Sequence, residues 1–165
     1  MPVYSLFGII AALLSGAGCI VHVIGLSVVY WIVSDPYVSG WGIGLWQSCN
    51  FYECNHHTTS FVCALEYWKA AQAMVMIGFF VGLAGFIFTI ISVQQRNRIL
   101  HLVSAISCIL AAVSILLAVI VFGAKTKLKA NTQWGWGFIL CAISPFIFFP
   151  AGVLNFWLYR GTGSV

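Results

Sequence analysis

The sequence predicts an α-helical membrane protein that crosses the bilayer four times, folded as one tetraspan domain over residues 1–165. The first observation is composition: 62% of the residues are hydrophobic and 6% are charged, whereas a water-soluble domain carries roughly 25% charged residues. The second is segment length, because a helical span needs about 20 apolar residues. Four segments reach that length, and the predicted spans are residues 4–31, 67–93, 100–124 and 134–159.

The first predicted span is expected to be a retained helix. Its apolar stretch is much longer than the roughly 7–15 residues of a signal-peptide core, and no basic residue precedes it. His22 is its only ionisable side chain. We therefore expect this segment to direct insertion and to remain in the membrane.

Small residues recur along the spans at helical spacing. Lipid tails remove the hydrophobic drive between helices, so close packing in a bilayer depends on small side chains. These stripes predict packing within one chain, with lateral self-association as the alternative use. The residues concerned are Gly78 and Gly82 in the second span, and Ser107, Ala111, Ser114 and Ala118 in the third.

Two polar residues and two prolines stand out within the spans. His22 and Asn155 are predicted to bridge helices, although ionisable groups in a membrane also mark functional sites. Pro145 and Pro150 each remove a backbone donor, so the fourth span is expected to kink or loosen near its middle. No chain of acidic residues crosses the spans, which argues against a proton relay.

Orientation follows from the loops. Basic residues flank both membrane faces in similar numbers, so the positive-inside rule does not orient the chain. The first loop, about residues 32–66, contains Cys49, Cys54 and Cys63. Paired cysteines imply an oxidising compartment. This loop and the second one, about residues 125–133, are therefore predicted to be extracellular, with both termini cytoplasmic.

The loop cysteines predict a β-hairpin closed by a Cys49–Cys54 disulfide. Four residues separate them, which suits a hairpin turn with facing strand positions. A Cys49–Cys63 bond is the alternative, since three cysteines leave one over. The neighbouring residues that suit strands are Ile43, Leu45, Phe51 and Tyr52.

Other chemistry is poorly supported. A zinc site could be drawn from Cys54, His56, His57 and Cys63, but adjacent histidines on a strand point to opposite faces. We predict no metal and no cofactor. No paired carboxylates, nucleophile–base set or phosphate loop appears, so an enzyme is not expected. The few basic residues are too scattered for nucleic-acid binding.

A signature in the first loop resembles a known family. Trp31, then Gly44-Leu45-Trp46, then Cys49 and Cys54 follow one another in that order. They resemble the W…GLW…C…C signature of the superfamily of claudins, peripheral myelin protein, epithelial membrane proteins and lens fibre membrane intrinsic protein. Length, four spans, a long first loop and a short second loop are similar too, so the resemblance extends over the whole chain.

Within that superfamily the chain is more similar to the epithelial and lens branches than to claudins proper. Their cysteines are closely spaced, as Cys49 and Cys54 are here. Claudins tend to carry an arginine near the start of the second helix, where this chain has Gln72. The resemblance implies a left-handed four-helix transmembrane bundle capped by a small disulfide-held extracellular β-sheet. It also implies that the ring of Trp46 enters the outer end of the bundle, and we expect its indole N–H to remain in water.

The resemblance and the loop together suggest a structural cell-junction or adhesion protein at plasma-membrane cell–cell contacts. The expected partners are membrane lipid, further copies or another lateral partner in the same membrane, and a protein on a facing membrane. Two alternatives remain: an auxiliary subunit of a membrane channel, and a paracellular barrier or pore using Asp35, Glu53 and Glu66. The residues predicted to make extracellular contacts are Trp41, Phe51 and Tyr52.

Overall fold

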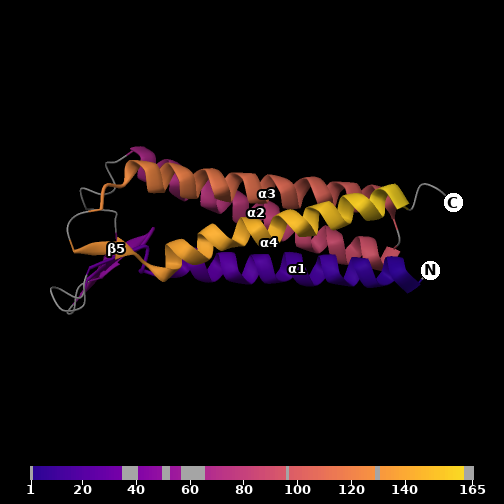
Figure 1. Ribbon diagram of the computed structural model, residues 1–165, viewed down its shortest axis with the longest axis horizontal. Coiled ribbons are helices and arrows are strands. Elements are labelled where there is room, and N and C mark those ends of the chain that lie inside the picture. The colour runs from indigo at the N-terminus through magenta and orange to yellow at the C-terminus, as the bar shows by residue number, and fades with distance from the viewer. Residues whose placement is uncertain are drawn as a thin grey trace.

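Four long helices dominate the computed structural model, which describes residues 2–34, 41–49, 53–56, 66–95, 97–128 and 131–161. Each is long and apolar enough to cross a membrane. They lie lengthwise beside one another, with a small sheet at one end (the sheet end) and the outer ends of α1 and α4 at the other (the terminal end; Figure 1). The helices are α1 (Pro2–Ser27), α2 (Glu66–Gln95), α3 (Arg98–Lys125) and α4 (Trp136–Gly161).

The helices form a ring in which α1 and α3 each pack against both α2 and α4. Large apolar side chains point outward, and Leu13 and Phe146 are about 70% exposed (68% and 71%). Small residues such as Ala11 and Ala111 are fully buried inside. A water-soluble protein places its large apolar side chains inside, so this distribution indicates a lipid surround.

The helix ends differ from the predicted span bounds by one to four residues, and two of these differences affect the sheet end. The helix α1 ends at Ser27 instead of continuing to Trp31, so Trp31 lies outside the helix and is free to fold back onto the bundle. The helix α4 begins at Trp136, because residues 132–134 belong to a strand. Between α2 and α3, the side chain of Asn97 accepts the backbone N–H of Ile99 at 3.0 Å and caps the start of α3.

The prolines of α4 do not interrupt it, because the helix is continuous through both Pro145 and Pro150. Pro145 lacks the N–H that would have donated to the carbonyl of Cys141, four residues earlier. The hydroxyl of Ser144 donates to that carbonyl instead, at 3.0 Å. The acceptor freed by Pro145 is therefore satisfied locally, which explains how this proline is tolerated.

Both loops contribute to a single five-stranded antiparallel sheet. Its strands are β1 (Ile32–Ser34), β2 (Gly42–Ile43), β3 (Gln47–Cys49), β4 (Cys54–His56) and β5 (Thr132–Trp134), in the order β4-β3-β2-β1-β5. The sequence predicted residues 125–133 as a plain loop, so β5 was missed. Three residues are too few for an alternating pattern to show. Asn131, whose φ of 69° lies in the left-handed region that asparagine tolerates, turns the chain into β5.

Of the residues predicted to lie in strands, one lies in a strand and one lies in a bend. Ile43 lies in β2, but Leu45 lies in the bend between β2 and β3, so its expected strand position was wrong. Phe51 and Tyr52 lie outside the described residues. The position of Leu45 matters because this bend is the part of the sheet that meets the helices.

Candidate functional site

The strongest concentration of specific contacts lies where the sheet meets the sheet end of the helices. We call this region the junction. The residues described there offer no group of three metal-ligating side chains, and the same holds for the rest of the described chain. The junction is instead built from aromatic side chains, closely packed glycines, the Gln72 amide and backbone carbonyls. Its chemistry is therefore that of a structural attachment.

Trp31 closes the end of α1. Its side chain is fully buried, and its ring meets Phe122 at 5.0 Å and Phe138 at 5.7 Å, both edge-on. Its indole N–H donates to the carbonyl of Gly25 at 2.9 Å. The last four carbonyls of a helix lack partners within the helix. Trp31 thus fills the core and satisfies one of those carbonyls at once.

Trp46 makes the equivalent bond one residue further along. Its half-buried indole donates to the carbonyl of Leu26 at 3.0 Å. The expectation that this N–H would remain in water was wrong, because an unpaired carbonyl of α1 lies within reach. The two tryptophans of the signature, Trp31 and Trp46, therefore cap neighbouring carbonyls in the final turn of α1.

Gly44 is required by the closeness of the chain that follows α1. A Cβ placed on Gly44 would lie 2.6 Å from Cα of Val29 and 2.8 Å from the carbonyl oxygen of Val28. Real side chains do not approach backbone so closely, and both obstructing atoms belong to backbone that cannot rotate away. Only glycine fits here without moving the sheet relative to α1.

Leu45 connects the sheet to α2. Its side chain is fully buried, and its carbonyl accepts two hydrogen bonds. The indole of Trp68 donates at 3.0 Å and the amide of Gln72 donates at 2.7 Å. Gln72, which stands where claudins tend to carry arginine, therefore has a defined role. It holds the signature against α2 with a neutral donor.

Phe122 on α3 lies at the centre of the junction. Four aromatic rings surround it at centroid distances between 4.7 and 6.2 Å, from residues Trp31, Trp68, Trp134 and Phe138. They come from the chain after α1, from α2, from β5 and from α4. One cluster thus joins all four helical regions to the sheet. Sequence reasoning missed Phe122, Trp68 and Trp134, because an apolar ring in a span looks like any lipid-facing residue.

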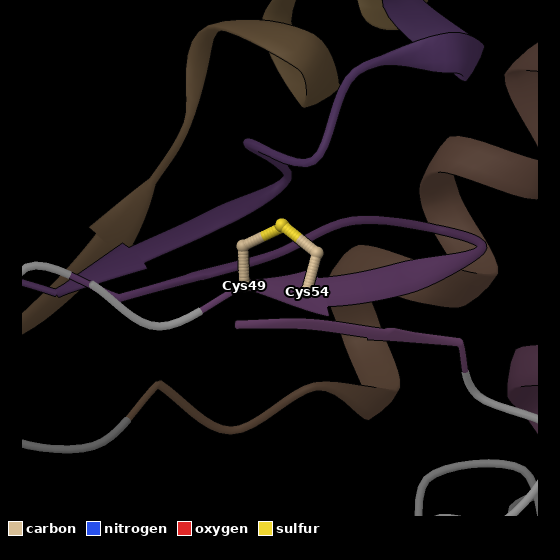
Figure 2. Close-up of a disulfide and its surroundings, with 2 residues drawn as sticks. All are labelled: Cys49 and Cys54. Carbon is tan, nitrogen blue, oxygen red and sulfur yellow. A yellow bond between two sulfur atoms is a disulfide. The ribbon is translucent and has the colours of Figure 1, made fainter. Parts of the chain in front are cut away.

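A disulfide closes the hairpin of β3 and β4. Cys49 and Cys54 are directly paired in the register, and a bond joins their sulfur atoms across Cα atoms 4.0 Å apart (Figure 2). Cys54 therefore has no free thiolate, which removes one donor from the weighed zinc site. His57 and Cys63, which that site also needed, lie outside the described residues.

Of the three residues predicted to make extracellular contacts, only Trp41 is described. It lies just before β2 and is partly buried. Its backbone N–H donates to the hydroxyl of Ser34 at 3.1 Å, and its carbonyl accepts the N–H of Ser34 at 3.0 Å. Its backbone is thus held to β1. The use of its ring in a contact between cells stays a prediction.

The small-residue stripes face the interior of the bundle. Gly78, Gly82, Ala111 and Ala118 are buried, while Ser107 and Ser114 are half-buried. A Cβ on Gly78 would meet Ile115 at 2.5 Å, and one on Gly82 would meet Phe148 at 2.8 Å. These positions therefore serve packing among α2, α3 and α4. They leave the large apolar side chains to face outward.

The two polar residues singled out in the spans both connect helices. His22 on α1 lies 3.2 Å from the hydroxyl of Ser144 on α4 and 3.2 Å from the carbonyl of Val75 on α2. Asn155 on α4 donates to the hydroxyl of Thr89 on α2 at 3.2 Å, and its amide oxygen lies 3.3 Å from Nδ1 of His101 on α3.

The fold and the junction together define a class: a four-span membrane protein whose disulfide-held sheet is bonded to the ends of its helices. The model of the PMP-22/EMP/MP20/Claudin tight-junction family matches residues 45–156. The chain belongs to this family. No individual curated protein gives a significant match.

Family membership establishes the general character of the molecule. It is a tight-junction-type structural protein of the plasma membrane, in a family of structural membrane proteins that are not enzymes. The matched region contains Trp46 and both disulfide cysteines. The family model covers the claudin, myelin, epithelial and lens branches together, so the closer similarity to the epithelial and lens branches stays a prediction.

Proposed function

We propose that this protein is a cell-junction adhesion protein that acts through its first loop, with identical copies associating laterally in one membrane. The junction is the observation that carries the proposal. The indoles of Trp31, just before β1, and Trp46, between β2 and β3, bond the sheet region to α1, and the Leu45 carbonyl bonds it to α2. Trp134 of β5 contacts Phe122 of α3 and Phe138 of α4. A load on the sheet would therefore pass directly into the membrane-embedded helices.

An extracellular position for the sheet end supports this function. The Cys49–Cys54 bond would persist in an oxidising compartment and would be reduced in the cytosol. The first turn of α1 and the last turn of α4 lie at the opposite end (Figure 1). Both termini would then be cytoplasmic, as in our expectation from the sequence.

Lateral association would have to use the outward faces of the helices. The small-residue stripes are occupied within the chain, so they are not open to a second copy. The large exposed side chains, such as Leu13 on α1 and Phe146 on α4, are the surfaces that remain. A copy-to-copy contact would replace lipid chains on these faces with van der Waals packing.

Expression in non-adherent cells tests the adhesion function. Cells carrying the protein should aggregate above control cells, and labelled copies should concentrate where two expressing cells touch. A variant with Cys49→Ser and Cys54→Ser should reach the surface but aggregate less, because its hairpin loses the covalent closure. Arg98→Lys, a conservative change at the exposed terminal end, is the matched control for insertion. Equal aggregation of expressing and control cells would contradict the proposal.

Other measurements test the two alternative functions, a paracellular barrier or pore and an auxiliary subunit of a channel. Glu53 and Glu66 are exposed at the sheet end, which favours a cation-selective paracellular path to a limited degree, while Asp35 lies outside the described residues. Epithelial resistance with and without the protein tests that function. Extraction in mild detergent tests the channel-subunit alternative: a stoichiometric unrelated channel would support it, whereas homo-oligomers support adhesion.

A further inference from the structure

Two separate sets of hydrogen-bonded side chains cross the interior of the bundle. The first, which we call the His22 collar, joins His22 on α1 to the Val75 carbonyl on α2 and to Ser144 and Cys141 on α4. The second, the His101 collar, joins α2, α3 and α4 through His101, Asn155, Thr89, Ser92 and Ser104. These residues are at most 6% exposed.

The partners of His22 decide which ring nitrogen carries the proton. The carbonyl of Val75 can only accept, so Nε2 of His22, 3.2 Å away, must carry a hydrogen. In the neutral ring, Nδ1 is then an acceptor. The hydroxyl of Ser144 lies 3.2 Å from it, and the thiol of Cys141 lies 4.0 Å from it as a second, weaker donor. The Ser144 hydroxyl and the Cys141 thiol are thus two donors for two acceptors. These acceptors are Nδ1 of His22 and the Cys141 carbonyl that Pro145 leaves without its helical partner.

The partners of His101 require the other tautomer. The amide of Asn155 donates to the carbonyl of Ala151 at 3.0 Å, which fixes its nitrogen and oxygen in place. Its oxygen can only accept, so Nδ1 of His101, 3.3 Å away, must carry the hydrogen. Ser92 is compatible with this, because its own hydroxyl donates to the carbonyl of Thr89 and its oxygen can accept from Nδ1.

The surroundings favour an uncharged ring in both collars. An isolated cation in a bilayer interior is unfavourable unless a carboxylate pairs with it. The carboxylates among the described residues are Glu53 and Glu66, which are exposed at the sheet end. The nearest described cation to His101 along the chain is Arg98, one turn earlier on α3, and it would oppose a second positive charge.

The His22 collar is linked to the junction through Gly25. Gly25 is one turn from His22 on α1 and lies against Cys141, because a Cβ placed on it would be 2.9 Å from Sγ of Cys141. The carbonyl of Gly25 accepts the indole of Trp31. Among the described side chains, those of the His101 collar come from α2, α3 and α4. Of the two collars, the His22 collar is therefore the one that holds α1 beneath the sheet.

We infer that the two buried histidines are held as opposite neutral tautomers, and that His22, through its Nε2–H, is a positioning residue for Trp31 and the sheet. His22 holds the last turns of α1 against α2 and α4. The final turn of α1 presents the carbonyls of Gly25 and Leu26 to the indoles of Trp31 and Trp46. The His101 collar serves a different purpose, which is to join the three remaining helices near the terminal end.

Amide substitutions test the tautomers, because a glutamine nitrogen can replace Nε2–H and an asparagine nitrogen can replace Nδ1–H. His22→Gln should preserve the position of α1, whereas His22→Leu should not. The readout is hydrogen–deuterium exchange of the Trp31 indole N–H, followed by NMR in lipid nanodiscs. His22→Leu should accelerate that exchange about tenfold or more, since a local hydrogen bond is lost. His101→Leu is the matched control and should leave it within about threefold of wild type.

Nitrogen-15 spectra of labelled histidine in the unsubstituted protein give an independent test. They should show His22 protonated at Nε2 alone and His101 protonated at Nδ1 alone. If His22→Leu does not fold, these spectra and the contrast between His22→Gln and His22→Asn still decide the question. Protonation of His22 at Nδ1 or at both nitrogens would overturn the inference. So would equal acceleration of Trp31 exchange by His22→Leu and His101→Leu.

Discussion

At the scale of single residues, the signature is a set of distinct physical tasks. Trp31 and Trp46 each donate to a carbonyl that the end of α1 leaves unpaired. Gly44 allows the backbone of the sheet to approach the chain after α1. Leu45 buries its side chain and offers its carbonyl to α2. The order of the motif follows from this geometry, because each residue meets a different neighbour as the chain passes over the bundle.

Gly44→Ala should destabilise the protein by about 1–3 kcal/mol, the usual cost of inserting a methyl group into a packed site. Thermal unfolding in detergent, followed by tryptophan fluorescence, measures this. Gly123→Ala is the matched control. Gly123 lies on α3, and a Cβ there would make an ordinary 3.6 Å contact with Phe138, so the change should be neutral or slightly stabilising. Equal losses in both variants would contradict the role given to Gly44.

The two donors to the Leu45 carbonyl should behave non-additively. Trp68→Phe and Gln72→Leu should each cost about 1 kcal/mol for the hydrogen bond, because the other donor still satisfies the buried carbonyl. The double variant leaves it without either donor. It should lose about 1 kcal/mol more than the sum of the single losses, as measured in a double-mutant cycle. Simple additivity would show that the carbonyl finds a replacement donor.

At the scale of elements, the hairpin and the helices are held by different means. Strands of three residues bury too little surface to be stable alone, and β3 and β4 are both of that length. The disulfide compensates by closing the hairpin covalently. The helices are held by interdigitating small residues and by the two collars. Loosening the hairpin should therefore leave the bundle intact.

The Cys49→Ser and Cys54→Ser double variant tests this separation. For so short a loop, loss of the disulfide should cost about 2 kcal/mol, from the chain-entropy relation for loop closure. Hydrogen exchange should show faster exchange of the β3 and β4 amides, with α2 and α3 unchanged. A similar loss of protection in the helices would show that the hairpin and the bundle form one cooperative unit.

At the scale of the whole molecule, the two ends of the bundle differ in the type of basic residue that they carry. Among the described residues, Lys69, Lys125 and Lys127 lie near the sheet end, whereas Arg98 and Arg160 lie near the terminal end. Counting positive charges therefore predicts no orientation, because the ends carry similar numbers. Orientation rests on the disulfide, and the two ends can be distinguished chemically by an amine reagent.

Labelling of intact cells tests the orientation. A membrane-impermeant amine reagent should modify Lys127, which is exposed just beyond α3, and peptide mass spectrometry would locate the modification. Arg98→Lys places an amine at the opposite end as a control and should become labelled only after permeabilisation. Labelling of the residue-98 amine in intact cells, with Lys127 unmodified, would reverse the proposed topology.

The features that could be predicted from the sequence are those that depend on residues close together in the chain. The length of four apolar segments predicted the helices, because a bilayer imposes that length on any helical span. The spacing of Cys49 and Cys54 predicted their hairpin, since a hairpin is itself a local structure. Prediction was wrong where a distant partner decided the outcome. Leu45 has an apolar side chain that suits a strand, but its place in a bend depends on Trp68 and Gln72 in α2.

The sequence alone determined that this protein crosses a membrane four times and which family motif its first loop carries. These follow from segment length, apolarity and the order of a few residues. The tertiary structure decided how the loop is attached: that β5 joins the sheet, that Phe122 centres the junction, and that His22 spans three helices. The physical reason is that each of these contacts joins segments far apart in the chain, and only folding determines which ring or carbonyl lies within reach.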